Sequence, residues 1–431
     1  MYPQARSVFA IVCLLWVIAS AFFVTPLRAG DSKTPQAPQQ FAAGFQLPQL
    51  PGMSAPSADW QQWDSFFTFI VKRFGQDVPA NFKDAVGDAF LDSRYELSSL
   101  IGSAQASNPV PQLFLDSWQR LSPILNQALP AMSGAAASRY SSFVSAGDKL
   151  AVVGQQGAQL GLLQLSPDVL RGMARLIEPS ITADPLTYTT SIDTALRDLL
   201  GFESQLTSGQ SQQSWLERLH HFDPALAAAQ WLVPEASAGE KRPAGNPWFP
   251  DEKQLPAYLQ RVKALLVESS DRVAAKNKLA EQYRPLHRQI VLAAAWQESC
   301  WRQFIKKRNS FTLLASATGD LGLMQVNRHT WRGVYDLNAL SGDISYNSNS
   351  GSEILLYYLA RHAIRRGEDK HEGGNLARGT YSAYNGGPGQ LGRYRAANVN
   401  PGLRKVDEAF WEKFQAVSAG HEMDVQSCYR K

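Results

Sequence analysis

Hydrophobic side chains recur every three or four positions over much of the chain, which is the spacing of one face of an α-helix. The pattern is clear from Trp60 to about Ser237, with breaks at Pro79, Pro109 and Gly134. We therefore predict an all-α helical domain over residues 60–240. Its aromatic stripes are typical of a buried core, and its sequence shows no catalytic motif.

Helical patterns also dominate the rest of the chain, which is set off by a Pro- and Gly-containing stretch. We interpret residues 241–283 as a linker and a connecting helix that packs against the following domain. A C-terminal domain over residues 284–431 follows, with an apolar helix over His287–Trp301 and a later helix from about Asn347 to Arg366. We expect the polar segment Lys306–Ser310 to be a loop. The predicted fold class is mainly α throughout.

The N-terminus has the pattern of an export signal. An apolar run from Val8 to about Val24 follows Arg6 and ends in small residues before Gly30. We predict a cleaved signal peptide over residues 1–29 and a location in the periplasm or cell envelope. The run is also nearly long enough to span a bilayer, so an uncleaved N-terminal anchor is the alternative.

Residues 30–59 are rich in Pro, Gln, Ala and Ser, a composition that cannot bury a core, and we predict a linker there.

Charge is unevenly distributed along the remainder of the chain. Residues 281–431 carry a net charge of +6, whereas residues 30–280 carry −4. A basic C-terminal domain suits an anionic partner such as a cell-wall polymer, but ordinary surface scatter explains the same numbers nearly as well.

Cys300 and Cys428 are the two cysteines that remain once residues 1–29 are removed. An even number in an oxidising compartment favours a disulfide, which would tie the C-terminal tail to the predicted helix before it. Two buried free thiols are the alternative, because sequence alone does not bring the two residues within bonding range.

Glu298 is the most conspicuous candidate for chemistry. It follows Ala293–Trp296 in a very apolar helical setting, where an unpaired carboxylate is expensive to bury. Such a residue is either satisfied by a structural partner or is an acid whose pKa is raised by desolvation. The residues themselves leave both interpretations open.

Four segments in a fixed order extend this observation: Gln297–Ser299, Ser316–Gln325, Asn347–Gly351 and Ala383–Gly387. Together they resemble the catalytic domain of soluble-type lytic transglycosylases, which are relatives of goose-type lysozyme. Each segment alone is a weak signal, but four in order are specific. The resemblance covers the C-terminal third and implies a lysozyme-like α-helical catalytic domain.

The resemblance implies a role for each matched residue. Glu298 matches the single catalytic acid/base, and Ser299 the serine that helps orient its carboxyl group. The stretch Gly322–Gln325 matches the segment that lines the sugar groove, where Gly322 allows close backbone approach, Met324 forms part of the lining and Gln325 is a hydrogen-bonding partner.

Later matched residues complete the implied site. Tyr384 and Asn385 match the tyrosine and asparagine that approach the glutamate and the substrate, and Asn347 and Gly351 match a structural helix start. The implied reaction cleaves the β-1,4 bond between N-acetylmuramic acid and N-acetylglucosamine in peptidoglycan and closes a 1,6-anhydro ring, with no metal or organic cofactor. The implied partner is a peptidoglycan strand.

Three alternatives stay open. Asp320 stands where the family usually has a small residue, and a second carboxylate would allow water to be the nucleophile, as in a hydrolytic muramidase. A non-catalytic glycan-binding or assembly protein is the second, and residues 60–240 would then dock an envelope or secretion-machinery protein. Nucleic-acid binding is disfavoured, because no basic cluster exceeds Lys306–Arg308 and an exported chain rarely meets nucleic acid.

Overall fold

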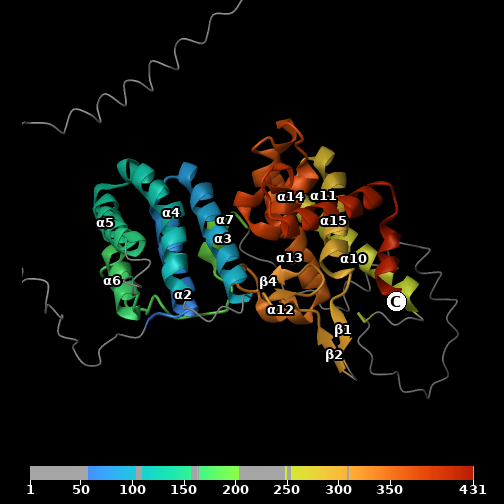
Figure 1. The fold of residues 1–431 in the computed structure, drawn as a ribbon, viewed down its shortest axis with the longest axis horizontal. Coiled ribbons are helices and arrows are strands. Elements are labelled where there is room, and N and C mark those ends of the chain that lie inside the picture. The colour runs from blue at the N-terminus through green and yellow to red at the C-terminus, as the bar shows by residue number, and fades with distance from the viewer. Residues whose placement is uncertain are drawn as a thin grey trace, which may run out of the picture. The chain divides into compact units, whose positions relative to one another are not determined.

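The computed structural model is mainly α (Figure 1). It describes residues 57–102, 109–156, 163, 165–202, 248–249, 254–307 and 310–430. The predicted signal peptide and most of the predicted linkers lie outside these residues. The described residues belong to one compact unit. Within the described part of the chain, every helix is too short or too polar to span a bilayer.

The N-terminal part of this unit is a layer of helices, shown in blue and green in Figure 1. They are α2 (Trp60–Asp77), α3 (Ala80–Gly102), α4 (Val110–Ala128), α5 (Gly134–Gln156), α6 (Pro167–Ile177) and α7 (Thr194–Leu200), with a 3₁₀ turn, η1, at Leu129–Ala131. Local sequence sets several of their ends. Asp59 and Gln62 form a capping box at the start of α2, and Gly201, in the left-handed region at φ 70°, ends α7.

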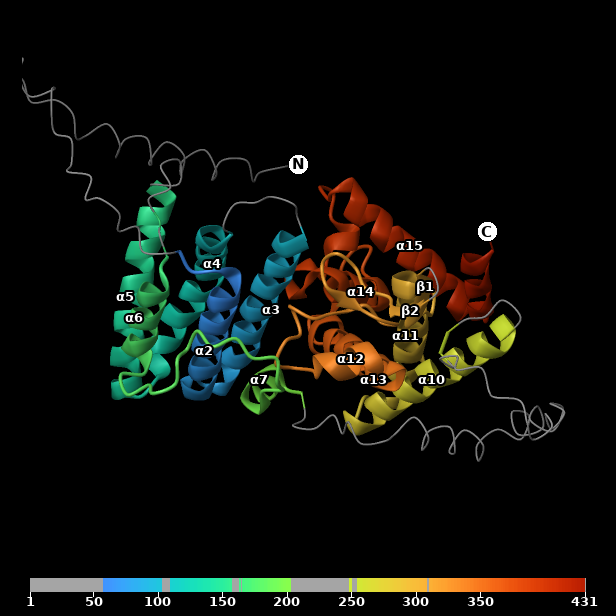
Figure 2. The ribbon, with the colours of Figure 1, turned by 90° about the horizontal axis from the view of Figure 1, so that it is seen from below.

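The C-terminal part is built around α11, which carries Glu298. Its elements are α10 (Leu255–Lys276), η4 (Glu281–Tyr283), α11 (Arg284–Ser299), β1 (Phe304–Lys307), β2 (Ser310–Leu313), β3 (Asp320–Leu321), β4 (Val326–Asn327), α12 (Leu337–Gly342), α13 (Ile344–Tyr357), the π-helical η5 (Tyr358–Ile364), η6 (Glu368–Lys370), α14 (Leu376–Gly386), η7 (Pro388–Gln390), η8 (Arg393–Arg395), α15 (Pro401–Ser418) and η9 (Glu422–Tyr429). Helix α10 packs against α11 and α13 (Figure 2), as expected for a connecting helix that packs against the following domain.

Two local predictions were wrong. The segment expected to be a polar loop around Lys306 pairs instead as an antiparallel hairpin, with Phe304 opposite Leu313. Aromatic and β-branched residues flank the charged ones there, and they favour strands. The connecting helix ends at Lys276 rather than near Tyr283, because Lys278 adopts a left-handed conformation (φ 53°).

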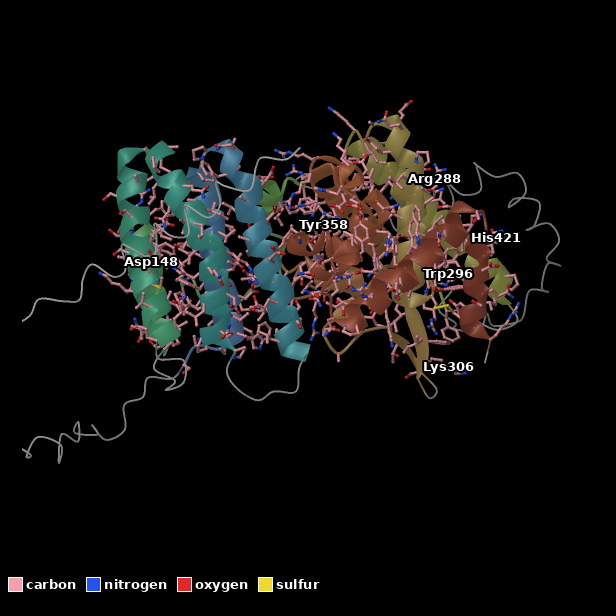
Figure 3. The ribbon with its side chains drawn as sticks, turned by 45° about the horizontal axis from the view of Figure 1, so that its top comes forward. Asp148, Arg288, Trp296, Lys306, Tyr358 and His421 are labelled. Atoms are coloured by element: carbon pink, nitrogen blue, oxygen red, sulfur yellow. A yellow bond between two sulfur atoms is a disulfide. The ribbon has the colours of Figure 1, made fainter. Side chains whose placement is uncertain are left out.

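One hydrophobic core runs through both helical layers, from Ala58 to Val425. The layers are also joined by a buried charge cluster. Arg94 of α3 and Arg332, which precedes α12, both donate to the carboxylate of Asp64 on α2, at 3.0 and 2.6 Å. Arg94 also donates to the backbone oxygens of Thr330 and Arg332. Each cation is satisfied, so the cluster holds α3 against the C-terminal layer. Tyr358 lies inside this layered region and Lys306 on the protruding hairpin (Figure 3).

Candidate active site

Glu298 lies in the last turn of α11. The preceding residues of this helix, Ala293–Ala295, are completely buried and Trp296 nearly so, which fixes the helix in the core. Cys300 then leaves the helix in a left-handed conformation (φ 52°). The carboxyl group of Glu298 therefore stands on a rigid element at the edge of the core, where it is half-buried.

A cleft with a volume of about 240 Å³ opens beside Glu298. Gln325, Tyr384 and Asn385 line it, so three of the residues predicted for the site lie around the predicted acid. The other lining residues are Tyr95, Ser98, Ser99, Thr318, Asp320, Val326, Asn327, Thr330 and Trp331. The cleft is polar enough to bind a sugar through hydrogen bonds.

The phenol that touches Glu298 belongs to Tyr381, which sequence analysis did not single out. Its hydroxyl donates to Glu298 Oε1 at 2.8 Å. Tyr381 stacks on Phe410 of α15 with 4.0 Å between ring centroids, so its position is fixed. The predicted Tyr384 instead donates to the backbone oxygen of Met324 at 2.6 Å. Tyr381 lies one helical turn before Tyr384 on α14, and this spacing is the signal that could have identified it.

Electrostatics favour the protonated form of Glu298. Burial raises the pKa of its carboxyl group to about 7, the hydrogen bond from Tyr381 opposes the rise, and the negative charge of Asp320 adds to it. A carboxyl group that is partly protonated near neutral pH can donate a proton to a leaving oxygen.

Asp320 is the second carboxylate of the cleft. Its oxygens accept hydrogen bonds from Thr318 Oγ1 at 2.6 Å, from Asn327 Nδ2 at 2.8 Å and from the Ser316 hydroxyl. These donors keep Asp320 in place near the start of β3. The two carboxylates therefore differ in surroundings: Glu298 has one side-chain donor and apolar neighbours, whereas Asp320 is held among polar donors.

The backbone beside the cleft makes a tight turn between β3 and β4. Gly322 adopts φ 70°, and a Cβ atom there would lie 2.2 Å from Gln303 Oε1, so only glycine fits. Gln303 accepts from the Leu323 N–H at 2.7 Å. Gln325 is itself left-handed at φ 48°, and its side chain donates to the Gly322 oxygen at 2.7 Å. The turn thus presents Gln325 to the cleft in a strained but well-anchored conformation.

Three predicted residues support the cleft from behind rather than line it. The Ser299 hydroxyl donates to the Leu323 oxygen at 2.6 Å and does not bond the Glu298 carboxyl group, so it ties α11 to the turn. Met324 is buried, and its N–H donates to Asn347 Oδ1 at 2.8 Å. Gly322 lies behind the cleft with them. Asn347, at the start of α13, makes the structural contacts that the resemblance implied.

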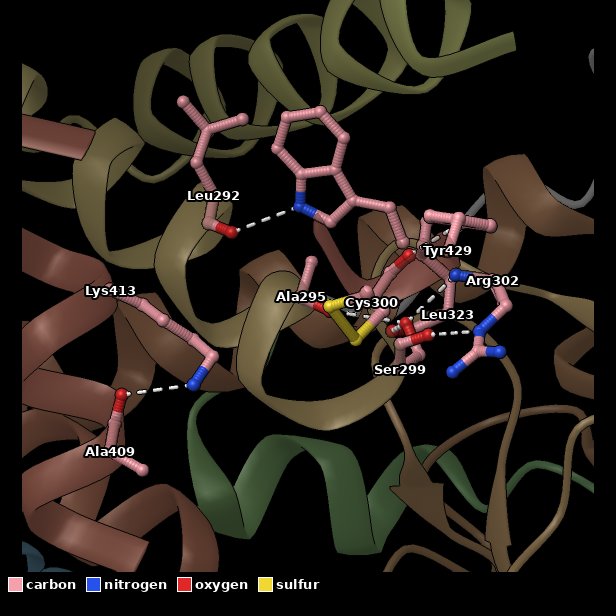
Figure 4. The surroundings of a disulfide bond; sticks show 11 residues. Leu292, Ala295, Ser299, Cys300, Arg302, Leu323, Ala409, Lys413 and Tyr429 are labelled. Carbon is pink, nitrogen blue, oxygen red and sulfur yellow. Dashed lines mark hydrogen bonds between the residues drawn. A yellow bond between two sulfur atoms is a disulfide. The ribbon is translucent and has the colours of Figure 1, made fainter. Parts of the chain in front are cut away.

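A disulfide joins Cys300 to Cys428 (Figure 4). It connects the end of α11, two residues after Glu298, to η9 at the C-terminal tail. The Tyr429 hydroxyl donates to the Cys300 oxygen at 2.7 Å, and the Trp301 indole donates to the Leu292 oxygen at 3.1 Å. The covalent bond and these hydrogen bonds hold the left-handed residues Cys300 and Trp301, which follow α11.

The described residues contain no group of three or more His, Cys, Asp or Glu side chains arranged to hold a metal ion.

Comparison with known proteins identifies the C-terminal part. Residues 276–405 match the family model described as Transglycosylase SLT domain. No curated protein and no solved structure matches the chain. The matched segment contains Glu298, the turn with Gln325 and the helix with Tyr381 and Tyr384. The C-terminal third of the chain is therefore a transglycosylase SLT domain. Such a domain is lysozyme-like and α-helical, and it supports peptidoglycan cleavage of the transglycosylase type.

Proposed function

We propose that the protein is a peptidoglycan lytic transglycosylase that cleaves the β-1,4 bond between N-acetylmuramic acid and N-acetylglucosamine without consuming water. The observation that carries the proposal is Glu298, an acid with its pKa raised to about 7, standing at a polar cleft within the SLT domain.

The proposed chemistry uses one carboxyl group twice. The Glu298 O–H donates its proton to the glycosidic oxygen, and the bond from that oxygen to C1 of muramic acid breaks. The resulting carboxylate accepts the proton of the muramic acid C6 hydroxyl, whose oxygen forms a new bond to C1. Glu298 ends as it began, and the products are a 1,6-anhydromuramic end and a free N-acetylglucosamine end.

Neighbouring side chains have supporting roles in this proposal. Tyr381 donates to Oε1 of Glu298 and orients the carboxyl group. Gln325 and Asn385 line the cleft with amide groups that suit sugar hydroxyl and acetamido groups. Tyr384, bonded to the Met324 oxygen, holds α14 against the glycine turn.

Digestion of purified sacculi tests this proposal. We expect released fragments with anhydromuramic ends, and a loss of release on the order of 10²- to 10⁴-fold in Glu298→Gln, which removes the proton donor but keeps the shape. Glu408→Gln, an exposed carboxyl group on α15, is the matched control and should release the same products as the wild type.

A hydrolytic muramidase is the second candidate, and the position of Asp320 in the same cleft favours it. The two reactions differ in the fate of water. Digestion in water labelled with heavy oxygen would place the label at a reducing muramic acid end only if water is the nucleophile. Label in the products, lost in Asp320→Asn, would replace the transglycosylase proposal with the hydrolase. Sacculus binding without any release would instead indicate a glycan-binding assembly protein.

We also propose that the protein acts outside the cytoplasm, in the periplasm or cell envelope. The Cys300–Cys428 disulfide supports this, because disulfides persist in oxidising compartments. Cell fractionation combined with N-terminal sequencing of the mature protein tests it. An N-terminus near residue 30 is expected; cytoplasmic protein that begins at Met1 would contradict the proposal.

A further inference from the structure

Helix α3 of the N-terminal layer forms one side of the cleft that contains Glu298. Tyr95, Ser98 and Ser99, all near its C-terminal end, line the same cleft as the predicted catalytic residues. Helix α3 packs against η7, which follows α14, and Figure 2 shows α3 beside α14. These residues lie outside the segment that matches the SLT family. The cleft is therefore assembled from both layers.

Two hydrogen bonds attach α3 to the turn that follows Tyr384. The Tyr95 hydroxyl donates to the Tyr384 oxygen at 2.7 Å, and the Gly389 N–H donates to Asp92 Oδ1 at 2.9 Å. The packing is close, because a Cβ atom on Gly387 would lie 2.7 Å from the same Asp92 oxygen. Asp92 and Tyr95 thus fix the end of α14, where Tyr384 and Asn385 face the cleft.

A second set of contacts runs from α3 to Asp320. The buried Ser98 hydroxyl lies 2.8 Å from Thr330 Oγ1 and 3.0 Å from Asn327 Oδ1. The amide nitrogen of Asn327 donates to Asp320 Oδ1 at 2.8 Å. Ser98 therefore supports the residue that positions the second carboxylate. Ser99, the next residue, is exposed at the cleft.

We propose that α3 is a wall of the substrate groove. Ser99 contacts the glycan strand through its hydroxyl, and Asp92 and Tyr95 are positioning residues that hold Tyr384 and Asn385 where the strand binds. The inference rests on the proposed function, because it concerns how the same site holds its substrate. It also gives the N-terminal layer a role in cleavage.

Filling the groove from the α3 side tests the contact at Ser99. Ser99→Trp places a large side chain into the cleft without disturbing the core, so sacculus digestion should fall on the order of 10- to 100-fold at an unchanged Tm. Ser142→Trp is the matched control, since Ser142 is an exposed serine of α5 in the same layer. In a Glu298→Gln background, Ser99→Trp should also weaken co-sedimentation with sacculi, and Ser142→Trp should not.

Removing a single hydroxyl tests the positioning role. Tyr95→Phe loses the bond to the Tyr384 oxygen, and we expect kcat on soluble glycan fragments to fall about 10-fold, because the groups at the cleft lose their fixed positions. Tyr140→Phe is the control: its hydroxyl donates to Asp77 at 3.0 Å, within the N-terminal layer. A purely structural role of α3 predicts that both variants lower Tm and that neither changes kcat.

The outcomes separate the inference from the proposed function. If the wild-type protein releases nothing from sacculi, the proposed function fails. If the wild type is active and both Ser99→Trp and Tyr95→Phe retain full kcat and KM, the function stands and α3 is not part of the groove. Loss in Ser99→Trp together with equal loss in Ser142→Trp would also overturn the inference.

Discussion

Glu298 shows how single side chains control the proposed reaction. Burial raises its pKa, Asp320 adds to the rise, and Tyr381 is the one group that lowers it. Tyr381 stacks on Phe410, and this contact orients its hydroxyl toward the carboxyl group. The protonation of Glu298 near neutral pH therefore depends on two opposing effects: burial at the end of α11 raises its pKa, and the hydrogen bond from Tyr381 lowers it.

The pH dependence of cleavage should report this balance. The donor must be protonated, so kcat/KM should fall above a pH of about 7, the pKa of Glu298. Tyr381→Phe removes the interaction that lowers this pKa, so the falling limb should move to higher pH while the maximal rate drops on the order of 10-fold. Tyr394→Phe, which loses a similar bond to Glu368 away from the cleft, is the control. If kcat/KM falls at the same pH in the wild type and in both variants, Glu298 is not the titrating acid.

The same carboxyl group should cost stability at alkaline pH. Its folded-state pKa lies above the unfolded value, so the folded state binds more protons between the two values and stability decreases as pH rises through them. Glu298→Gln should therefore raise Tm near pH 8, with little change near pH 4. Thermal unfolding at both pH values measures this effect. A destabilised Gln variant at alkaline pH would show that the hydrogen bond from Tyr381 outweighs the cost of burying the carboxylate.

Helices were predicted well where hydrophobic residues recur at helical spacing over a long stretch of sequence. The helices around Trp63 and Glu298 and the helix with Asn347 follow the three- and four-residue spacing closely, because each buries one continuous face. The β1–β2 hairpin was missed because its strands are short and interrupted by lysines. Sequence analysis predicted no helix around Tyr381 and Tyr384, although both lie on α14. The packing of Tyr381 against Phe410 decides which of the two phenols reaches Glu298.

Contacts between distant segments were beyond sequence reasoning. Tyr95 and Ser99 belong to no motif, and only the packing of α3 brings them to the cleft. The order of the four SLT segments, by contrast, located Glu298, Gln325, Tyr384 and Asn385 around one cleft, since local motifs there carry the site.

The end of α11 depends on its link to η9. Cys428→Ser should lower the free energy of unfolding by about 2–5 kcal/mol, because the disulfide closes a long loop and restricts the unfolded chain. Activity should fall as well, since Glu298 lies two residues before Cys300. Denaturant unfolding with and without reductant measures the effect, and Ser427→Ala, an exposed neighbour, is the control. Equal stability of the wild type with and without reductant would mean that the bond is not formed in solution.

For the molecule as a whole, buried charges and a continuous core join the two helical layers. Asp64 sits between two buried arginines, Arg94 and Arg332, and the exposed pairs of Asp84 with Arg361 and Arg365 lie elsewhere on the same interface. Buried charges lose far more than exposed ones when a partner is removed, because water cannot replace it.

Asp64→Asn should therefore lower the free energy of unfolding by about 3–5 kcal/mol, because it removes the carboxylate that the two buried guanidinium groups share. Asp84→Asn, whose pairs are exposed, should cost no more than about 1 kcal/mol. Denaturant melts of both variants should remain single transitions, since the core is continuous. Two separate transitions in Asp64→Asn would mean that the layers unfold independently.

The cystine also makes a closed covalent ring that contains the glycine turn, α13, α14 and α15, because its two half-cystines lie 128 residues apart in sequence. A protease that nicks any peptide bond inside this ring cannot release a fragment. The nicked protein keeps the mass of the intact chain plus one water, and Glu298 stays tethered to Tyr381 across the break. Only a thiol reductant would let the pieces separate on a denaturing gel, so a chain with one such nick retains all its parts until it is reduced.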